Sequence, residues 1–158
     1  MPSVLFVCTA NVCRSPLAEV LLRDWLRRQA VPGQWTVGSA GTWAEAGMPA
    51  SSYSQVMAEE RGLNLAPHAA RTVDGPLLAA ADVILCMSRS HREALQIEFP
   101  EHAARIHLWT ALAGPPYDIA DPYGGPRAGY AAMAAEMEAL VEKTGDHIVT
   151  LARQREAT

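Results

Sequence analysis

Short apolar runs alternate with stretches of helical spacing along the chain, and this alternation restricts the fold more than any other feature. The apolar runs cover residues 3–8, 35–40, 82–87 and 105–109. Helical stretches cover residues 16–30, 51–62, 75–81 and 90–99, and a last one begins near Pro126. Strands separated by helices form parallel βαβ units. The sequence therefore predicts one α/β domain, residues 1–158, with a doubly wound, four-stranded parallel sheet flanked by helices.

The composition is that of an ordinary globular protein and does not indicate nucleic-acid binding. The chain is 49% hydrophobic and 19% charged, with a net charge of −4, whereas nucleic-acid binders usually show clustered Lys and Arg. No segment approaches the ~20 apolar residues of a membrane span, and the first residues lack the features of a signal peptide. We expect a cytoplasmic monomer without nucleic-acid or membrane partners.

The chain contains three cysteines, which are too few for a disulfide framework in a reducing compartment. Such cysteines are buried hydrophobes, metal ligands or reactive thiols. The five histidines do not lie at zinc-finger spacing from a cysteine pair, so we predict neither a metal nor another cofactor. Cys86 falls within an expected strand and is predicted to be a core residue.

The stretch VCTANVCRSPLAE, residues 7–19, is the strongest functional signal. Cys8 ends the first strand, and Arg14 follows six residues later. Ser15 is a good helix N-cap and Pro16 a good first helical residue, so we expect a helix to begin there with free N–H groups over the loop. A turn after the first strand of a parallel sheet is a favoured ligand site.

This loop has the composition of a phosphate-binding loop, placed directly after the first strand. Its backbone amides can surround a tetrahedral dianion while Arg14 clamps two oxygens. A helix N-terminus and a nearby cation favour the thiolate form of cysteine, so Cys8 is predicted to attack phosphorus. Ser15 could donate its hydroxyl to the sulfur. The predicted phosphate-binding residues are Thr9, Ala10, Asn11, Val12, Cys13, Arg14 and Ser15.

A departing oxygen needs a proton, and Asp121 is the candidate acid because it lies in the Pro/Gly-rich loop IADPYGG. Each signal alone has a simpler interpretation. A strand cysteine such as Cys8 can be an inert buried thiol, and Asp-Pro is a common turn opener. The two signals together favour a catalytic pair.

Five segments, in order along the chain, resemble the low-molecular-weight protein tyrosine phosphatases: VCTANVCRSPLAE, SAGT at 39–42, HAAR at 68–71, DVILCMSRSH at 82–91 and DPYGG at 121–125. The resemblance implies that Cys8 is the nucleophile, that Arg14 binds phosphate and stabilises the transition state, and that Asp121 is the general acid and later the base. It implies a cysteinyl-phosphate intermediate without metal. Residues that match a network supporting the loop are Asn11, Ser15, Ser39 and His68.

The chain also departs from the family pattern. Trp43 falls in a loop that lines the pocket mouth in relatives, and Tyr123 resembles the aromatic residue that flanks the substrate ring. Gly124 replaces a second aromatic residue that relatives often have. Ala10 stands where many relatives have Gly, which implies that no positive φ is required there. Ser88 replaces an acidic residue, so we expect one polar contact near the arginine to be missing.

The resemblance favours phosphotyrosine-containing proteins as substrates, with a cognate tyrosine kinase as a candidate partner. Some bacterial members act on phosphoarginine and carry Thr where this chain has Val12 in the substrate pocket, although DPYGG looks closer to that branch. Arsenate reduction on the same scaffold requires two distal cysteines, and only Cys86 is available. Phosphoarginine hydrolysis and, less favoured, arsenate reduction therefore stay open as alternatives.

Cys13 is predicted to have a redox role. Two thiols five residues apart in a loop around one anion must lie close, within the ~4.4–6.8 Å Cα separation that a disulfide tolerates. A sulfenic acid on Cys8 would then have a resolving partner. In the simpler alternative, Cys13 only packs under the loop.

Overall fold

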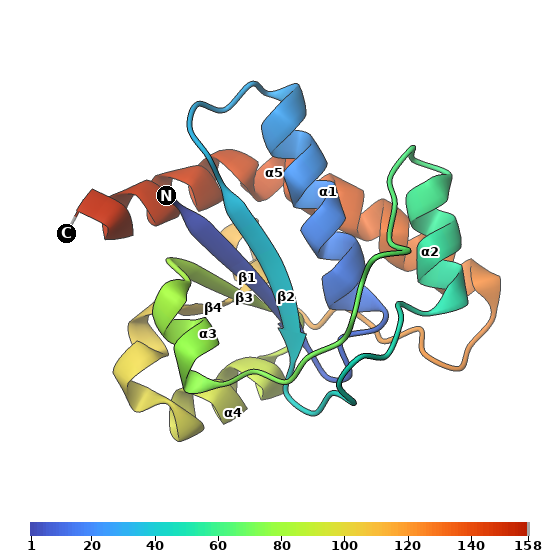
Figure 1. The fold of residues 1–158 in the computed structure, drawn as a ribbon, viewed down its shortest axis with the longest axis horizontal. Helices are drawn as coiled ribbons and strands as arrows, with labels where there is room; N and C mark the ends of the chain where they lie inside the picture. Colours follow the sequence, from blue (N-terminus) through green and yellow to red (C-terminus); the bar gives the residue numbers. More distant parts are fainter. Residues whose placement is uncertain (158) are drawn as a thin grey trace.

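The computed structural model describes residues 1–157 and consists of a parallel sheet between two layers of helices (Figure 1). Its strands, in the spatial order β2-β1-β3-β4, are β1 (Ser3–Cys8), β2 (Thr36–Gly41), β3 (Val83–Cys86) and β4 (Ile106–Leu108). The helices are α1 (Arg14–Arg28), α2 (Ser52–Glu59), α3 (Gly75–Ala80), α4 (Arg89–Glu98) and α5 (Arg127–Ala157). The predicted fold class, a four-stranded parallel α/β sheet, is confirmed.

The sheet divides the apolar core into two parts because successive side chains of a strand point to opposite faces. On β1, Phe6 belongs to the cluster under α1, α2 and α5, whereas Leu5 and Val7 belong to the cluster under α3 and α4 (Figure 1). Both faces are covered, so the strands can be apolar without alternation. Trp109 packs edge-on against Phe6, with ring centroids 4.9 Å apart.

The parallel register brings the carboxyl ends of the strands to one edge of the sheet. Cys8 of β1 lies opposite Gly41 of β2, and Val7 lies opposite Cys86 of β3. The chain runs from β1 to β2 on one side and later to β3 on the other, so the loop after β1 lies at the point where the strand order reverses. Such a point is where open α/β sheets bind ligands.

The start of α1 differs from the prediction. The helix begins at Arg14, and its N-cap residue, Cys13, makes no side-chain capping bond. Ser15 lies inside the helix, where its buried hydroxyl contacts the Cys8 thiol at 2.9 Å. The prediction that Ser15 caps the helix is therefore wrong, because its hydroxyl is engaged by the loop.

The segments around β4 were predicted less completely than the rest. Two short 3₁₀ helices, η1 (Pro100–Arg105) and η2 (Trp109–Leu112), precede and follow β4, and neither was predicted because such short turns have no apolar periodicity.

Within residues 1–157, no helix has the length and apolar character needed to cross a membrane.

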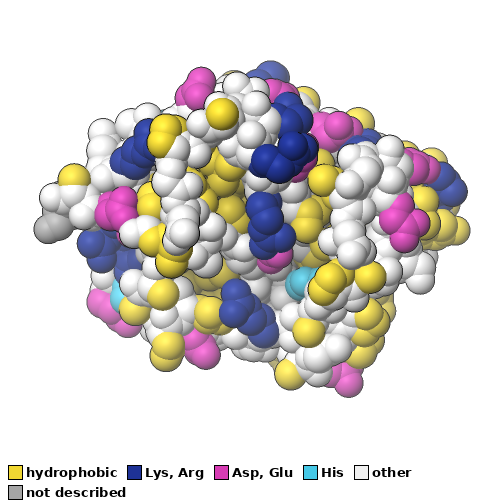
Figure 2. Space-filling view, turned by 45° about the horizontal axis from the view of Figure 1, so that its top comes forward, with side chains coloured by type: hydrophobic (Ala, Val, Ile, Leu, Met, Phe, Trp, Pro, Cys, Tyr) yellow, Lys and Arg dark blue, Asp and Glu magenta, His cyan; other side chains and the backbone are white. Residues whose placement is uncertain are grey.

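Charged side chains of both signs are intermixed on the face shown in Figure 2. Along α1, Arg23 pairs with Glu19 at 2.9 Å, and Asp24 accepts from Arg27 at 2.7 Å and from Arg28 at 2.8 Å. Exposed helix pairs of this kind contribute only about 0.3–0.5 kcal/mol each. The apolar core therefore dominates the stability of the helix layers.

We expect Gly145→Ala to destabilise the contact between α1 and α5. A Cβ at Gly145 would lie 2.4 Å from Cζ2 of Trp25, a ring that is 4% exposed. Overpacking a tight site costs about 1–3 kcal/mol, so the free energy of unfolding in urea should fall by that amount. Gly129→Ala is the control on the same helix, because its Cβ would meet Pro122 only at 3.7 Å. Equal effects of the two substitutions would contradict this account.

Candidate active site

The predicted catalytic residues meet in one pocket at the carboxyl edge of the sheet. The pocket has a volume of about 160 Å³. Cys8, at the end of β1, is 3% exposed, and its Sγ lies 2.9 Å from Ser15 Oγ. A hydroxyl at this distance can donate to a thiolate. The pocket is lined by Cys8, Thr9, Ala10, Val12, Cys13, Arg14, Asp121 and Tyr123.

The loop turns at Asn11, which has a φ of 59° and is fully buried. Asn is among the few residues that enter this left-handed region readily. Its side-chain amide donates to Ser15 Oγ at 2.8 Å and to Ser39 Oγ at 3.0 Å. Ala10 has no positive φ, as expected. Asn11 therefore both turns the loop through its left-handed backbone and fixes the loop through its side-chain hydrogen bonds.

The four predicted loop-supporting residues are in contact. His68 Nε2 lies 2.7 Å from the carbonyl oxygen of Asn11, which tethers the loop backbone from outside. Ser39, which accepts from Asn11, donates to Glu19 Oε1 at 2.9 Å. Asn11, Ser15, Ser39 and His68 therefore form one hydrogen-bonded group around the loop.

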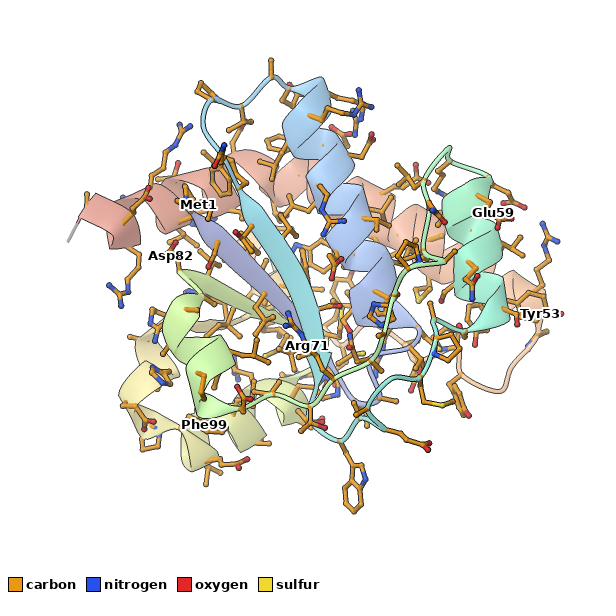
Figure 3. All side chains as sticks on the ribbon, in the orientation of Figure 1. Met1, Tyr53, Glu59, Arg71, Asp82 and Phe99 are labelled. Atoms are coloured by element: carbon orange, nitrogen blue, oxygen red, sulfur yellow. The ribbon has the colours of Figure 1, made fainter. Side chains whose placement is uncertain are left out.

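Two further members of this hydrogen-bonded group, Arg71 and Glu19, were not predicted from the sequence. The backbone N–H of Arg71 donates to Asn11 Oδ1 at 3.0 Å, and its Nε donates to the carbonyl of Ser39 at 3.0 Å. Figure 3 shows Arg71 lying against the end of β2. Glu19 and Arg71 lie within the motifs VCTANVCRSPLAE and HAAR, which is the only signal that could have identified them.

Arg14 is buried at the base of the pocket and is incompletely paired. Its Nη1 donates to the carbonyl of Ile119 at 2.9 Å, and its Nη2 lies 3.5 Å from Asp121 Oδ2. Its Nε is buried and has no hydrogen-bond partner among residues 1–157. Ser88, at the position of the missing acidic residue, caps α4 instead. A buried N–H without a partner is costly, and an anion in the pocket would satisfy it.

The loop that carries Asp121 is attached next to the pocket. Ile119 is 1% exposed, accepts from Arg14, and donates from its backbone to Met87 O at 2.9 Å. Two residues further, the Asp121 side chain is 47% exposed and accepts from the backbone N–H of Tyr123 at 3.1 Å. The carboxyl group is thus held beside Arg14 while it stays accessible to substrate and water.

The three predicted substrate-pocket residues do not all reach the pocket. Val12 and Tyr123 line it, whereas Trp43 is not among the lining residues and is 84% exposed. The backbone of Trp43 donates to Thr9 O at 2.9 Å. The loop after β2 is therefore attached to the phosphate-binding loop through its backbone, and the indole ring extends into solvent.

The other two cysteines lie in different environments. Cys13 Sγ lies 3.4 Å from both Ser51 Oγ and Tyr130 Oη, and burial raises the pKa of the thiol. Cys86 is buried in β3, where burial raises its pKa to about 12, as expected for a core residue. All three cysteines are free thiols, and the Cys8–Cys13 disulfide stays a prediction.

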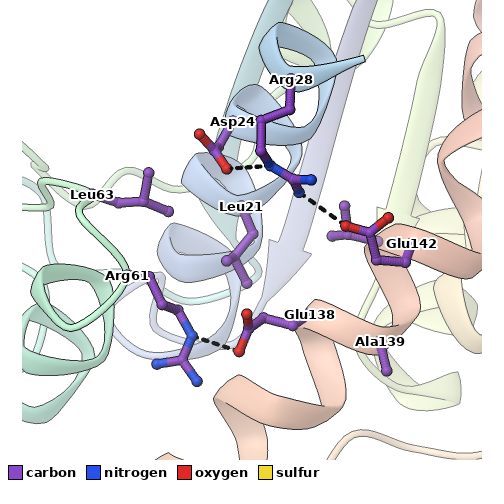
Figure 4. Close-up of a pocket in the computed structure, with 9 residues that line it drawn as sticks. Leu21, Asp24, Arg28, Arg61, Leu63, Glu138, Ala139 and Glu142 are labelled. Carbon is purple, nitrogen blue, oxygen red and sulfur yellow. Dashed lines mark hydrogen bonds and ion pairs between the residues drawn. The ribbon is translucent and has the colours of Figure 1, made fainter.

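A larger hollow, of about 510 Å³, lies between α1 and α5 (Figure 4). Two ion pairs lie along its walls: Arg61 pairs with Glu138 at 2.6 Å, and Arg28 pairs with Glu142 at 2.9 Å. Its lining consists of aliphatic side chains and charged side chains that are paired with each other. Of these two pockets, the smaller one is lined by cysteines and the larger one is not.

A strand-end cysteine, an arginine at the following helix start and an acid on a nearby loop are typical of cysteine-dependent phosphatases. Residues 3–156 match the family model described as low molecular weight phosphotyrosine protein phosphatase. The chain belongs to this family and is a phosphoric monoester hydrolase.

Individual relatives resemble the chain over nearly its whole length. A protein-arginine-phosphatase of Geobacillus stearothermophilus is 34% identical to this chain, and the aligned region covers 93% of this chain and 96% of that relative. The phosphatase PtpB of Staphylococcus aureus, a low molecular weight protein-tyrosine-phosphatase, is 32% identical over 92% of this chain and 98% of its own. The crystal structure of a low molecular weight protein tyrosine phosphatase from T. tengcongensis is 34% identical, with a TM-score of 0.87, and covers 93% of this chain and 99% of its own.

We expect Asn11→Ala to weaken both the fold and the loop. The substitution removes the side-chain N–H that the buried hydroxyls of Ser15 and Ser39 accept from, and it removes the acceptor of the Arg71 N–H. An unsatisfied buried group costs about 1–3 kcal/mol. The free energy of unfolding should fall by that amount, and activity should fall under conditions in which the variant is fully folded. Asn64→Ala is the control, because Asn64 is exposed and accepts from the nearby Ala66 N–H. Full activity of folded Asn11→Ala would contradict the role of this network.

Proposed function

We propose that the chain hydrolyses phosphotyrosine in proteins through a cysteinyl-phosphate intermediate. One observation carries the proposal: the Cys8 thiol, the unpartnered Nε of Arg14 and the carboxyl of Asp121 share one pocket. The pocket also adjoins the start of α1, whose free N–H groups favour an anion. These groups supply a nucleophile, a cationic group that binds the anion and a general acid, which are the three functions that hydrolysis of a phosphate ester requires.

In the first step, the Cys8 thiolate attacks phosphorus and the bond from phosphorus to the phenolic oxygen breaks. Asp121 donates its proton to the departing oxygen, so tyrosine leaves as a neutral phenol. Arg14 and the loop amides stabilise the charge on the equatorial oxygens, which is strongest in the transition state. The products are free tyrosine side chain and phosphorylated Cys8.

In the second step, water hydrolyses the cysteinyl phosphate. Asp121, now a carboxylate, accepts a proton from water as the water oxygen attacks phosphorus. The bond from sulfur to phosphorus breaks, and the Ser15 hydroxyl, 2.9 Å from the sulfur, stabilises the departing thiolate. Inorganic phosphate is released, and both Cys8 and Asp121 return to their starting states.

The lining of the pocket supports an aryl substrate. Tyr123 lies at the pocket and is 70% exposed, so its ring is free to stack on a phenyl group. Val12 adds an apolar side chain to the wall. Phosphoarginine is the second candidate substrate, because the relative from Geobacillus stearothermophilus is named a protein-arginine-phosphatase and the DPYGG segment looks closer to that branch.

We place the enzyme in the cytoplasm as a monomer that acts on phosphoproteins supplied by a cognate tyrosine kinase. The three free thiols are compatible with a reducing compartment. Size-exclusion chromatography with light scattering tests the monomer, and co-purification with a kinase tests the partner.

Cys8→Ser tests the nucleophile. A serine hydroxyl is a weaker nucleophile than a thiolate and a poorer leaving group in the second step, so turnover of phosphotyrosine peptides should be lost. Binding of inorganic phosphate should persist, because Arg14 and the loop amides are unchanged. The matched control is Cys86→Ser, a cysteine of the same sheet outside the pocket. Retained turnover in folded Cys8→Ser would overturn the mechanism.

Asp121→Asn tests the acid. General acid catalysis contributes typically 10²–10⁴-fold, so hydrolysis of phosphotyrosine should slow by about that factor. p-Nitrophenyl phosphate should lose less activity, because its leaving group needs less help from a proton. Asp118→Asn is the control on the same loop. Equal losses on both substrates would indicate a structural role for Asp121.

Val12→Thr tests the choice between the two substrates. A hydroxyl at this wall can orient a guanidinium group or water, which the valine cannot do. The ratio of kcat/KM for phosphoarginine to that for phosphotyrosine peptides should therefore rise. An unchanged ratio would show that another residue determines substrate preference.

A further inference from the structure

A second chain of hydrogen bonds, separate from the Asn11 network, runs from the pocket to the surface of α4. Thr9, the residue after Cys8, lines the pocket, and its Oγ1 lies 2.8 Å from His91 Nε2. The other ring nitrogen, Nδ1, lies 2.8 Å from Ser88 Oγ, which lies 2.9 Å from Ser90 Oγ. Helix α4 is thereby joined to the loop directly beside the nucleophile.

His91 is suited to a connecting role because it is buried and uncharged. It is 6% exposed, and burial together with Arg14 lowers its pKa to about 4, against the opposing effect of Asp121 and Asp118. A neutral imidazole carries one donor and one acceptor nitrogen, so it can bond to a hydroxyl on each side. Ser88 is itself fixed as the N-cap of α4, accepting from the backbone N–H of His91.

Thr9 is also held from the opposite side. Its carbonyl oxygen accepts from the backbone N–H of Trp43 at 2.9 Å, and the carbonyl of Cys8 accepts from Thr42 at 2.9 Å. The loop after β2 therefore holds the backbone of this segment, and α4 holds the Thr9 side chain. An anion site is most effective when its donors are oriented before the anion arrives.

We propose that His91 is a positioning residue that acts through Thr9 Oγ1 and holds the start of the phosphate-binding loop in its anion-accepting conformation. His91 itself does not touch the substrate. This inference rests on the anion-binding role given to the loop in the proposed function. Loss of one neutral hydrogen bond corresponds to roughly a 2- to 10-fold loss of affinity, which is the effect expected for inorganic phosphate.

A double-mutant cycle in the full-length chain tests the proposal, with inorganic phosphate as the probe and calorimetry as the measurement. Thr9→Val and His91→Leu should each weaken phosphate binding by roughly 2- to 10-fold. The double variant should bind phosphate about as tightly as the single variant with the lower affinity, because both changes remove the same bond. His91→Gln, which keeps a side-chain N–H, should recover much of the affinity, a result that loss of packing alone does not predict.

His147→Leu, a substitution of an exposed histidine on α5, is the control and should leave phosphate affinity unchanged. Additive losses in the cycle would overturn the proposal. Thr9 is exposed, so Thr9→Val does not threaten the core, and wild-type affinity in that variant would overturn the proposal even if His91→Leu failed to fold. If the wild-type chain bound no phosphate, the proposed function would fail; equal binding by the wild type and all variants would overturn only the role of His91.

Discussion

The side-chain amide of Asn11 is the interaction on which the pocket depends. The loop after β1 must reverse direction within a few residues, and it does so at one residue with a left-handed backbone. The same residue is fully buried and bonds to Ser15 on α1, Ser39 on β2 and the backbone of Arg71. A buried amide that satisfies partners on three segments fixes one geometry, because any other loop conformation would leave several polar groups unpaired.

Arg14 connects this loop to the loop that carries Asp121. One nitrogen of its guanidinium holds the carbonyl of Ile119, and another faces Asp121 two residues further along. The residue that would clamp phosphate therefore also determines where the acid loop starts. An anion that displaces Asp121 from Arg14 would leave the carboxyl free to meet the leaving group, whereas the Ile119 contact would keep the loop in place. In the proposed mechanism, phosphate binding and proton transfer would thus be coupled through one side chain.

The sequence predicted the fold and much of the site because their signals are local. Apolar runs of strand length were correctly placed, and the Cys8–Arg14 segment carries its loop, helix start and proposed nucleophile in contiguous residues. Contacts between distant segments were predicted only where the family motifs indicated them. The bond from Thr9 to His91, which joins residues 82 positions apart, was not predicted, because neither residue is unusual alone. Ser15 was misassigned as a helix cap because a serine at a helix start is usually one, whereas its expected contact with the Cys8 sulfur is present, together with a bond from Asn11.

The walls of the pocket differ in polarity, and this difference bears on substrate choice. Val12 is 8% exposed and presents no hydrogen-bonding group, whereas Thr9 carries a hydroxyl that is already bonded to His91. A guanidinium group requires acceptors for several N–H donors, and apart from Asp121 the walls supply few of them. Each buried donor left unpaired costs about 1–3 kcal/mol. A phenyl ring has no such requirement and gains from the exposed ring of Tyr123. The unpaired donors of a guanidinium group and the stacking of a phenyl ring both favour an aryl phosphate. A hydroxyl added at position 12 would reduce the first of these effects by offering the guanidinium group an acceptor.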